Sequence, residues 1–231
     1  MIADWLAFWD RPNSIYVSAR HKDVHYRLIA NEIAAVVPGP DARVLDYGSG
    51  EALHADVVAS AAGELILCEA APGVRAALQK RFADNPQIRV VAPHEIAQLQ
   101  PHSLDLVVLH SVAQYLTAAG AGALFTLFHR LLKPDGLLIV SDVLQPEVAA
   151  TTDAWTLLRF GQANGFFFAA LWGLVRTVAS DYWRLRSQLG LTRYANAAML
   201  EKLNAAGFAA QRGPANIGHN QARRTYFARP R

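Results

Sequence analysis

A short loop that begins with a carboxylate and continues with glycines is the first candidate binding site. Residues 46–52 read Asp-Tyr-Gly-Ser-Gly-Glu-Ala and directly follow the apolar pair Val44-Leu45. A glycine loop at the end of a strand lets the backbone approach a ligand closely. A dinucleotide loop would need a third glycine where Leu53 stands, and a Walker loop would need a lysine. The acid at Asp46 favours a cationic partner over a pyrophosphate, so we expect a ligand that carries positive charge.

Further segments continue this pattern in order along the chain. Glu69 ends the apolar run 65–68, and the segments 103–108, 131–138 and 200–208 follow it. Together these segments resemble class I S-adenosylmethionine-dependent methyltransferases, whose first motif is a strand followed by D/E-x-G-x-G-x-G. Ala52 stands at the last glycine position of that motif. The resemblance implies S-adenosylmethionine as the methyl donor and an enzyme that transfers its methyl group.

The resemblance also implies roles for single residues. Glu69 would accept both ribose hydroxyls of the donor, Gly48 and Gly50 would bring the backbone beside its methionine moiety, and Asp46 would lie near its ammonium group. In place of the Asp that many members have after the third strand, residues 92–96 read Ala-Pro-His-Glu-Ile. The expected donor-binding residues are Asp46, Gly48, Ser49, Gly50, Glu69, Ala70, His94, Glu95, Ile96, His110, Tyr16 and Arg20, and we expect no metal site. The alternative is that the two acids only cap helices and the glycines only turn the chain.

Two histidines are candidates for a general base. A base is needed only when the acceptor loses a proton, as a hydroxyl does. His110 directly follows the fourth apolar run, at the expected ligand edge of the sheet, where either its ring acts as a base or its carbonyl meets the donor. His25 lies with Tyr16, Arg20 and Tyr26 in a lead segment that is either a lid or a solvated helix start. Nucleic-acid and protein amide N-methyltransferases often have N-P-P-Y/F after the fourth strand, and its absence counts against them.

Alternating strands and helices must position these residues. Strands are expected at 43–45, 64–69, 88–91, 104–109, 137–141, 207–208 and 224–228, helices at 26–37, 52–61, 72–82, 119–132 and 195–206, and a turn at 134–136. Continuous apolar strands that alternate with helices indicate a parallel sheet covered on both faces. We predict an α/β fold with a Rossmann-like, mostly parallel seven-stranded sheet. Residues 1–42 would form an N-terminal helical lid and residues 43–231 the methyltransferase domain, with a helical insertion at about 149–189.

The composition excludes several other classes of protein. With 231 residues, 52% hydrophobic and 18% charged, the chain is neither disordered nor of low complexity. A single cysteine, Cys68, excludes an internal disulfide and fits a reducing compartment, and the net charge of +3 is too small to indicate nucleic acid. The N-terminus lacks the features of a signal peptide, and the longest uncharged stretch, 160–175, falls short of the roughly 20 residues of a spanning helix. We expect a cytoplasmic protein, with peripheral contact to the inner face of a membrane as an option.

An apolar block in the insertion bears on the acceptor. It is either a roof over an apolar pocket, a membrane contact, a helix packed on the sheet or a homodimer interface, and a cluster near the N-terminus could share its role. We predict a small, hydrophobic or lipid-like acceptor. An RNA methyltransferase and a non-catalytic binding or partner protein are the alternatives. The residues concerned are Phe160, Phe166, Phe167, Phe168, Leu171, Trp172, Leu174 and Val175 in the block, Trp5, Leu6, Phe8 and Trp9 near the N-terminus, and Arg223, Arg224, Arg229 and Arg231 for RNA.

Overall fold

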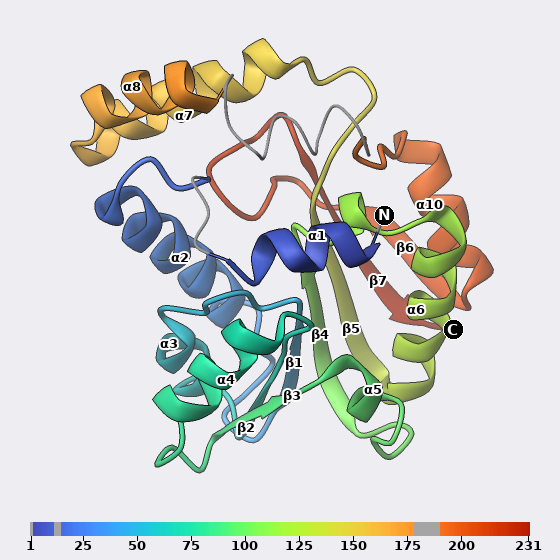
Figure 1. Cartoon of the computed structure of the whole chain (residues 1–231). Helices are drawn as coiled ribbons and strands as arrows, with labels where there is room; N and C mark the ends of the chain where they lie inside the picture. Colours follow the sequence, from blue (N-terminus) through green and yellow to red (C-terminus); the bar gives the residue numbers. More distant parts are fainter. Residues whose placement is uncertain (1, 12–14, 178–189) are drawn as a thin grey trace.

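One sheet of seven strands forms the centre of the molecule, in the order β3-β2-β1-β4-β5-β7-β6 (Figure 1). The computed structural model describes residues 2–11, 15–177 and 190–231. Strands β1 to β5 pair in parallel, and β7 runs antiparallel to both β5 and β6. The predicted Rossmann-like, mostly parallel sheet is therefore confirmed. The strands are β1 (Arg43–Tyr47), β2 (Glu64–Cys68), β3 (Ile88–Val91), β4 (Leu104–His110), β5 (Leu132–Val143), β6 (Phe208–Arg212) and β7 (Arg224–Pro230).

Helices cover both faces of the sheet, as expected. One face carries α2, α3 and α4, and the other carries α5, α6 and α10, with separate apolar cores beneath the two groups. The described helices are α1 (Ile2–Trp9), α2 (Ala19–Ala34), α3 (Ala55–Ala59), α4 (Pro72–Arg81), α5 (Pro93–Ile96), the short 3-10 helix η1 (Ala113–Tyr115), α6 (Ala118–Leu131), α7 (Ala150–Asn164), α8 (Phe167–Thr177) and α10 (Asn196–Ala205). Residues 178–189, which belong to the predicted insertion, lie outside the described part of the chain.

The central strands have apolar residues in their middle positions because both faces of the sheet are buried there. Successive side chains of a strand point to opposite faces of the sheet. Val44 accordingly belongs to the core under α2 and α3, whereas the next residue, Leu45, belongs to the core under α6. The same alternation holds in β2, where Leu67 and Cys68 lie in different cores and each is almost fully buried.

Two element boundaries differ from the sequence-based expectation. Strand β5 begins at Leu132, because Leu104 pairs with Leu132 and Leu106 pairs with Leu137, so the predicted turn at 134–136 is a bulge inside the strand. Helix α2 begins at Ala19, seven residues before the expected start at position 26. The hydroxyl of Ser18 accepts a hydrogen bond from the His21 backbone N–H at 3.1 Å, and this cap accounts for the earlier start.

The helices α7 and α8 pack on each other beyond the end of the sheet at which β4 and β5 finish (Figure 1). Gly165 takes a left-handed backbone conformation, with φ at +73°, and ends α7 so that the chain can reverse into α8. Helix α7 also contacts α2, which places both beside the same edge of the sheet. No helix among the described residues combines the length and the apolar character needed to cross a bilayer.

Candidate active site

The loop after β1 folds into a tight cradle at the carboxyl edge of the sheet. Gly48 and Gly50 have φ angles of +81° and +57°, a region that favours glycine, and a methyl group added at Gly48 would overlap Val112. The Gly48 N–H donates to the Cys68 carbonyl oxygen at 2.7 Å, which ties the loop to the end of β2. Ala52 has a φ of +41°, so it keeps the backbone form that a glycine at this motif position would adopt.

Glu69, at the end of β2, holds the loop from the opposite side. Its Oε2 accepts a hydrogen bond from the Gly50 N–H and its Oε1 accepts one from the Ala71 N–H, both at 2.8 Å. Burial raises the pKa of this carboxyl, and the two backbone donors oppose that shift. Each carboxylate oxygen keeps a further lone pair, so Glu69 can still accept hydrogen bonds from a diol.

Asp46 and Ser49 add polar groups to the same cradle. Burial and the neighbouring Glu69 carboxylate raise the pKa of Asp46 to about 7. A cation beside Asp46 would favour its charged form and lower that pKa again. The Ser49 hydroxyl is buried and has no hydrogen-bond partner among the described residues. An orphaned hydroxyl and a carboxylate without a cation are what a zwitterionic ligand with hydroxyl groups would satisfy.

A single cavity of about 920 Å³ runs from this cradle under α1, α2 and α7. Helix α1 closes one side, since Trp5 packs on Tyr115 with ring centroids 4.8 Å apart and Asp10 accepts a hydrogen bond from the Gly73 N–H at 2.5 Å. Helix α2 closes another side, where the Tyr26 hydroxyl accepts from the Glu51 N–H at 3.1 Å. The predicted residues that line the cavity are Asp46, Gly48, Ser49, Gly50, Glu69, Ala70, His110, His25 and Tyr16.

Four of the predicted site residues lie elsewhere. His94 is exposed, Ile96 is part of the core, and the Glu95 carboxylate accepts from the Ala92 N–H at 2.7 Å as a helix cap. From this segment the cavity is lined by Pro93. Arg20 is exposed and donates to the Asn164 carbonyl oxygen, in a separate shallow pocket beside α8.

Four histidines gather at the end of the cavity away from Glu69. They are His21, His25, His110 and His219. His21 stacks on Phe166 with ring centroids 4.9 Å apart, and His219 stacks on Phe160 at 4.4 Å. Burial lowers the pKa of all four rings, that of His21 to about 4, so each is neutral at pH 7. His219 lies in a loop near the end of the chain, and only the fold brings it here.

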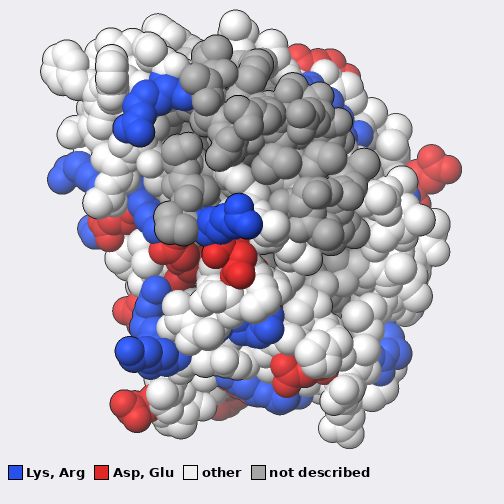
Figure 2. Space-filling model, viewed as in Figure 1, with Lys and Arg blue, Asp and Glu red and all other residues white. Residues whose placement is uncertain are grey.

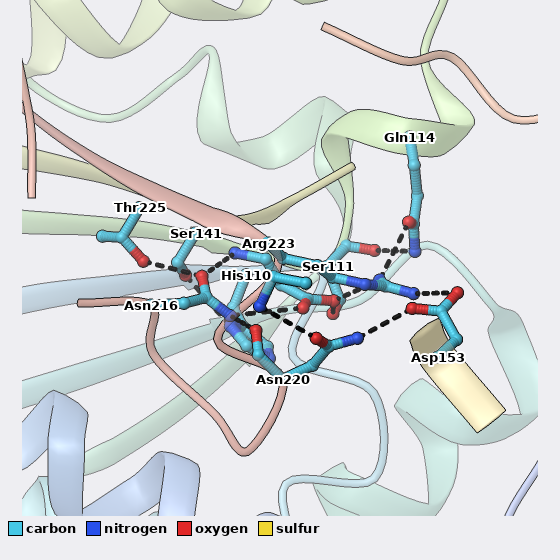
Figure 3. A network of polar contacts seen from close by, with 11 residues as sticks. His110, Ser111, Gln114, Ser141, Asp153, Asn216, Asn220, Arg223 and Thr225 are labelled. Carbon is cyan, nitrogen blue, oxygen red and sulfur yellow. Dashed lines mark hydrogen bonds and ion pairs between the residues drawn. The ribbon is translucent and has the colours of Figure 1, made fainter. Parts of the chain in front are cut away.

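A polar network joins the ends of β4 and β5 to α7 (Figure 3). Arg223 donates to Asp142 at 2.8 Å and lies 3.4 Å from Asp153 of α7, and Asn220 donates to Asp153 at 2.7 Å. Ser111 donates to Asp142, and both residues have left-handed backbones, with φ at +57° and +58°. Non-glycine residues rarely adopt this conformation, and such strain is common at functional sites.

The sequence alone did not predict this network, because its residues are spread over more than a hundred positions of the chain. The order of the strands, which places β7 beside β5, brings them together. Within the described part of the chain, no group of three or more His, Cys, Asp or Glu side chains is arranged to hold a metal ion.

Comparisons with known proteins agree with the geometry of the cradle. Residues 45–140 match a family model described as a methyltransferase domain. A search of curated proteins finds none that matches this sequence. Many solved structures match this chain. Three of them share 14% to 17% identity with it, and at that level the similarity establishes the fold alone.

The complex of DhpI with SAH shares 14% identity at a TM-score of 0.62, over 99% of this chain and 96% of that one. The SAH-bound magnesium protoporphyrin IX methyltransferase of Synechocystis PCC 6803 shares 17% at a TM-score of 0.58, over 99% and 94%. The pyocyanin biosynthetic protein PhzM shares 14% at a TM-score of 0.58, and the match covers 89% of this chain but only 55% of PhzM. Residues 45–140 therefore match a methyltransferase domain, and the chain has the fold of these solved structures, with the cradle at the end of β1 inside the matched stretch.

Proposed function

We propose that the protein transfers the methyl group of S-adenosylmethionine to a small, apolar acceptor. The observation that carries this proposal is that one cavity connects the cradle of Gly48, Gly50 and Glu69 to an end lined by aromatic and aliphatic side chains. When bound, the donor supplies an electrophilic methyl group, and holding the acceptor in line with it provides much of the rate acceleration.

The residues of the cradle fit this donor. The Glu69 carboxylate would accept the ribose hydroxyls, Asp46 would face the ammonium group, and the buried Ser49 hydroxyl would gain the partner that it lacks among the described residues. A side chain at Gly48 would collide with Val112 and one at Gly50 with the Tyr26 hydroxyl, so the tight turn of the cradle depends on glycine at both positions.

Residues 1–42 would act as the lid and residues 43–231 as the methyltransferase domain. Support for the lid comes from Trp5 of α1, from His25 and Tyr26 of α2 and from Tyr16 between these helices, which all line the cavity. Tyr16 and Tyr26 are hydrogen-bonded to each other beside the cradle, and burial raises the pKa of both hydroxyls, so both stay protonated at neutral pH.

The test of the proposed function is turnover with a panel of acceptors. Purified protein and S-adenosylmethionine labelled in the methyl group should release labelled product with apolar acceptors and not with polar metabolites, because the lining of the cavity as a whole is mostly apolar. Incubation without an acceptor provides the background. Clear turnover of polar metabolites alone would contradict the proposed acceptor class.

A second proposal concerns peripheral contact with a membrane. On α8, Phe168 is 83% exposed, Trp172 64% and Val175 62%, and on α7 the guanidinium of Arg159 lies 5.5 Å from the ring centroid of Trp155. Exposed aromatic side chains flanked by arginine suit an interface with anionic lipid. We infer that this apolar face of α8 rests on the bilayer from which a lipid-like acceptor would come.

Sedimentation with vesicles measures that contact. The protein should co-sediment with phosphatidylcholine vesicles that contain phosphatidylglycerol. The double variant Phe168→Ser, Trp172→Ser should lower the bound fraction several-fold, because it removes two aromatic side chains that would insert into the lipid. Circular dichroism confirms that the variant is folded. Wild-type protein that stays in the supernatant would overturn the membrane contact. A dimer in light scattering that the double variant abolishes would assign this face to a second copy.

The alternatives predict other outcomes. Three of the four arginines that could contact RNA already have partners within the protein. Arg223 donates to Asp142, Arg229 donates to the Asp135 carbonyl oxygen and Arg231 donates to Asn204. On the face shown in Figure 2, the described Lys and Arg side chains are interspersed with Asp and Glu. A non-catalytic partner protein would bind the donor and transfer no methyl group to any acceptor.

A further inference from the structure

Two buried ring nitrogens in the cavity have no hydrogen-bond partner among the described residues. They are Nε2 of His110, at the end of β4, and Nδ1 of His25, in α2. Both histidines line the cavity. Both lie beside the same loop: a Cβ at Gly218 would lie 3.7 Å from His110 Cε1, and the ring of the next residue, His219, has its centroid 5.7 Å from that of His25. Buried polar atoms are nearly always paired, so two unpaired ring nitrogens in one cavity indicate a ligand that supplies their hydrogen-bond partners.

His110 is held in an orientation that suits a base. Its Nδ1 lies 3.0 Å from the hydroxyl of Ser141, which is completely buried beside it in β5. With the ring proton on Nδ1 and donated to Ser141, Nε2 carries the free lone pair. Burial lowers the pKa of His110, so the ring is neutral and able to accept a proton at pH 7.

The Asp142 carboxylate would stabilise the positive charge that His110 gains when it accepts a proton. This carboxylate opposes the lowering of the pKa of both His110 and His25, which means that it favours their protonated forms. Arg223 and Ser111 fix its position through the network in Figure 3, and their bonds help to keep it ionised. Asp142 is therefore a positioning and charge-stabilising residue for a histidine base.

The charges around the cavity narrow the class of acceptor. The Asp, Glu, Lys and Arg side chains among the described residues that line it are five acids and one arginine: Asp46, Glu51, Glu69, Asp142, Asp153 and Arg223. A carboxylate acceptor would be repelled there. A protonated amine would need a carboxylate at the histidine end, where Arg223, Ser111 and Asn220 already engage Asp142 and Asp153. A hydroxyl donates one hydrogen bond and its oxygen accepts another. This matches two neutral imidazoles, one of which offers a free lone pair and the other an N–H group.

We propose that the acceptor is an apolar hydroxyl compound, whose oxygen accepts a hydrogen bond from His25 Nδ1–H and gives its proton to His110 Nε2. This assignment rests on the proposed methyltransferase function. The acceptor oxygen forms a bond to the methyl carbon while the bond from that carbon to sulfur breaks, with its electron pair left on sulfur. The proton ends on His110, beside Asp142, so atoms and charges balance. The rings of His219 and His21 line the cavity, where their stacking on Phe160 and Phe166 holds them as flat walls for an aromatic acceptor.

The test compares one apolar frame with three functional groups: 2-naphthol, 2-naphthylamine and 2-naphthoic acid. We expect methyl transfer to the naphthol alone. His110→Asn keeps a polar group near Ser141 but lacks Nε2, and it should lower kcat on 2-naphthol at least 100-fold while the Kd for S-adenosylmethionine changes less than threefold. The matched control is His102→Asn, the same substitution just before β4, where the exposed residue has a left-handed backbone that asparagine tolerates.

A nitro-substituted naphthol that is already ionised at pH 8 separates a base from a structural role. It needs no base, so the loss in His110→Asn should shrink at least tenfold on this acceptor. An equal loss on both naphthols would overturn the role of His110. Donor binding with no transfer to 2-naphthol, or preferred transfer to the amine or the acid, would overturn the hydroxyl assignment and leave the donor site standing. Failure of wild-type protein to bind the donor at all would overturn the proposed function itself.

Discussion

The variant Glu69→Gln should bind S-adenosylmethionine at least 100-fold more weakly than the wild-type protein. The carboxylate has two tasks, since both of its oxygens accept backbone N–H groups and both would accept ribose hydroxyls. An amide has one oxygen and one NH₂ group, so one backbone donor would face another donor. Losing two hydrogen bonds to a charged group, each worth about 1.5 to 3 kcal/mol, corresponds to a factor of at least about 100 in affinity.

Calorimetric titration with S-adenosylmethionine and S-adenosylhomocysteine measures this effect. The matched control is Glu64→Gln at the other end of β2, where the carboxylate pairs with Arg43 away from the cradle. The control should keep wild-type affinity, and thermal unfolding should show both variants folded. A Glu69→Gln protein that binds the donor as tightly as the control would contradict the assigned site.

The variant Arg223→Met should lose about 3 kcal/mol of unfolding free energy. Arg223 and its two carboxylate partners are mostly buried, with side-chain exposures of 14%, 14% and 20% for Arg223, Asp142 and Asp153. Removing one member of a buried ionic group leaves the others uncompensated, and this typically costs 3 to 5 kcal/mol. The lower end of that range applies because neither carboxylate is wholly sealed from water.

Urea unfolding followed by circular dichroism gives the free energies. Adding Asp142→Asn to Arg223→Met removes one stranded charge and should restore part of the lost stability. A second arginine provides the surface comparison: Arg27 is 57% exposed and paired with Asp23 within α2, so Arg27→Met should cost less than about 1 kcal/mol. Equal losses of unfolding free energy in Arg27→Met and Arg223→Met would show that the network of Figure 3 stabilises the fold no more than a surface ion pair does.

Local patterns were sufficient to predict the sheet and its binding loop. The strands β2 and β4 are buried on both faces, so their apolar runs stand out, and residues 46–52 have the composition of a glycine loop. Even the departure at Ala52 preserves the backbone form, with a positive φ. Binding residues that directly follow a strand can be predicted from the sequence, because the strand determines where in the fold they lie.

The histidine end of the cavity depends instead on long-range packing. His219 and Arg223 follow the last helix, and they reach His110 and Asp142 only because β7 inserts beside β5. No periodicity within the sequence carries that information. The predicted residues His94 and Arg20 failed to reach the cavity for a local reason, since each lies on the exposed side of a helix. Whether they contact the donor by another route stays a prediction.

The single cysteine gives the donor site a built-in reporter. Cys68 is completely buried, its carbonyl oxygen accepts the Gly48 N–H, and burial raises the pKa of its thiol, so the reactive thiolate does not form in the closed state. Because this side chain also belongs to the core beneath α5 and α6, a reagent can reach the sulfur only when the packing around the end of β2, to which the cradle is bonded, opens. The rate of thiol labelling therefore counts openings of the cradle, without any introduced dye or any knowledge of the acceptor.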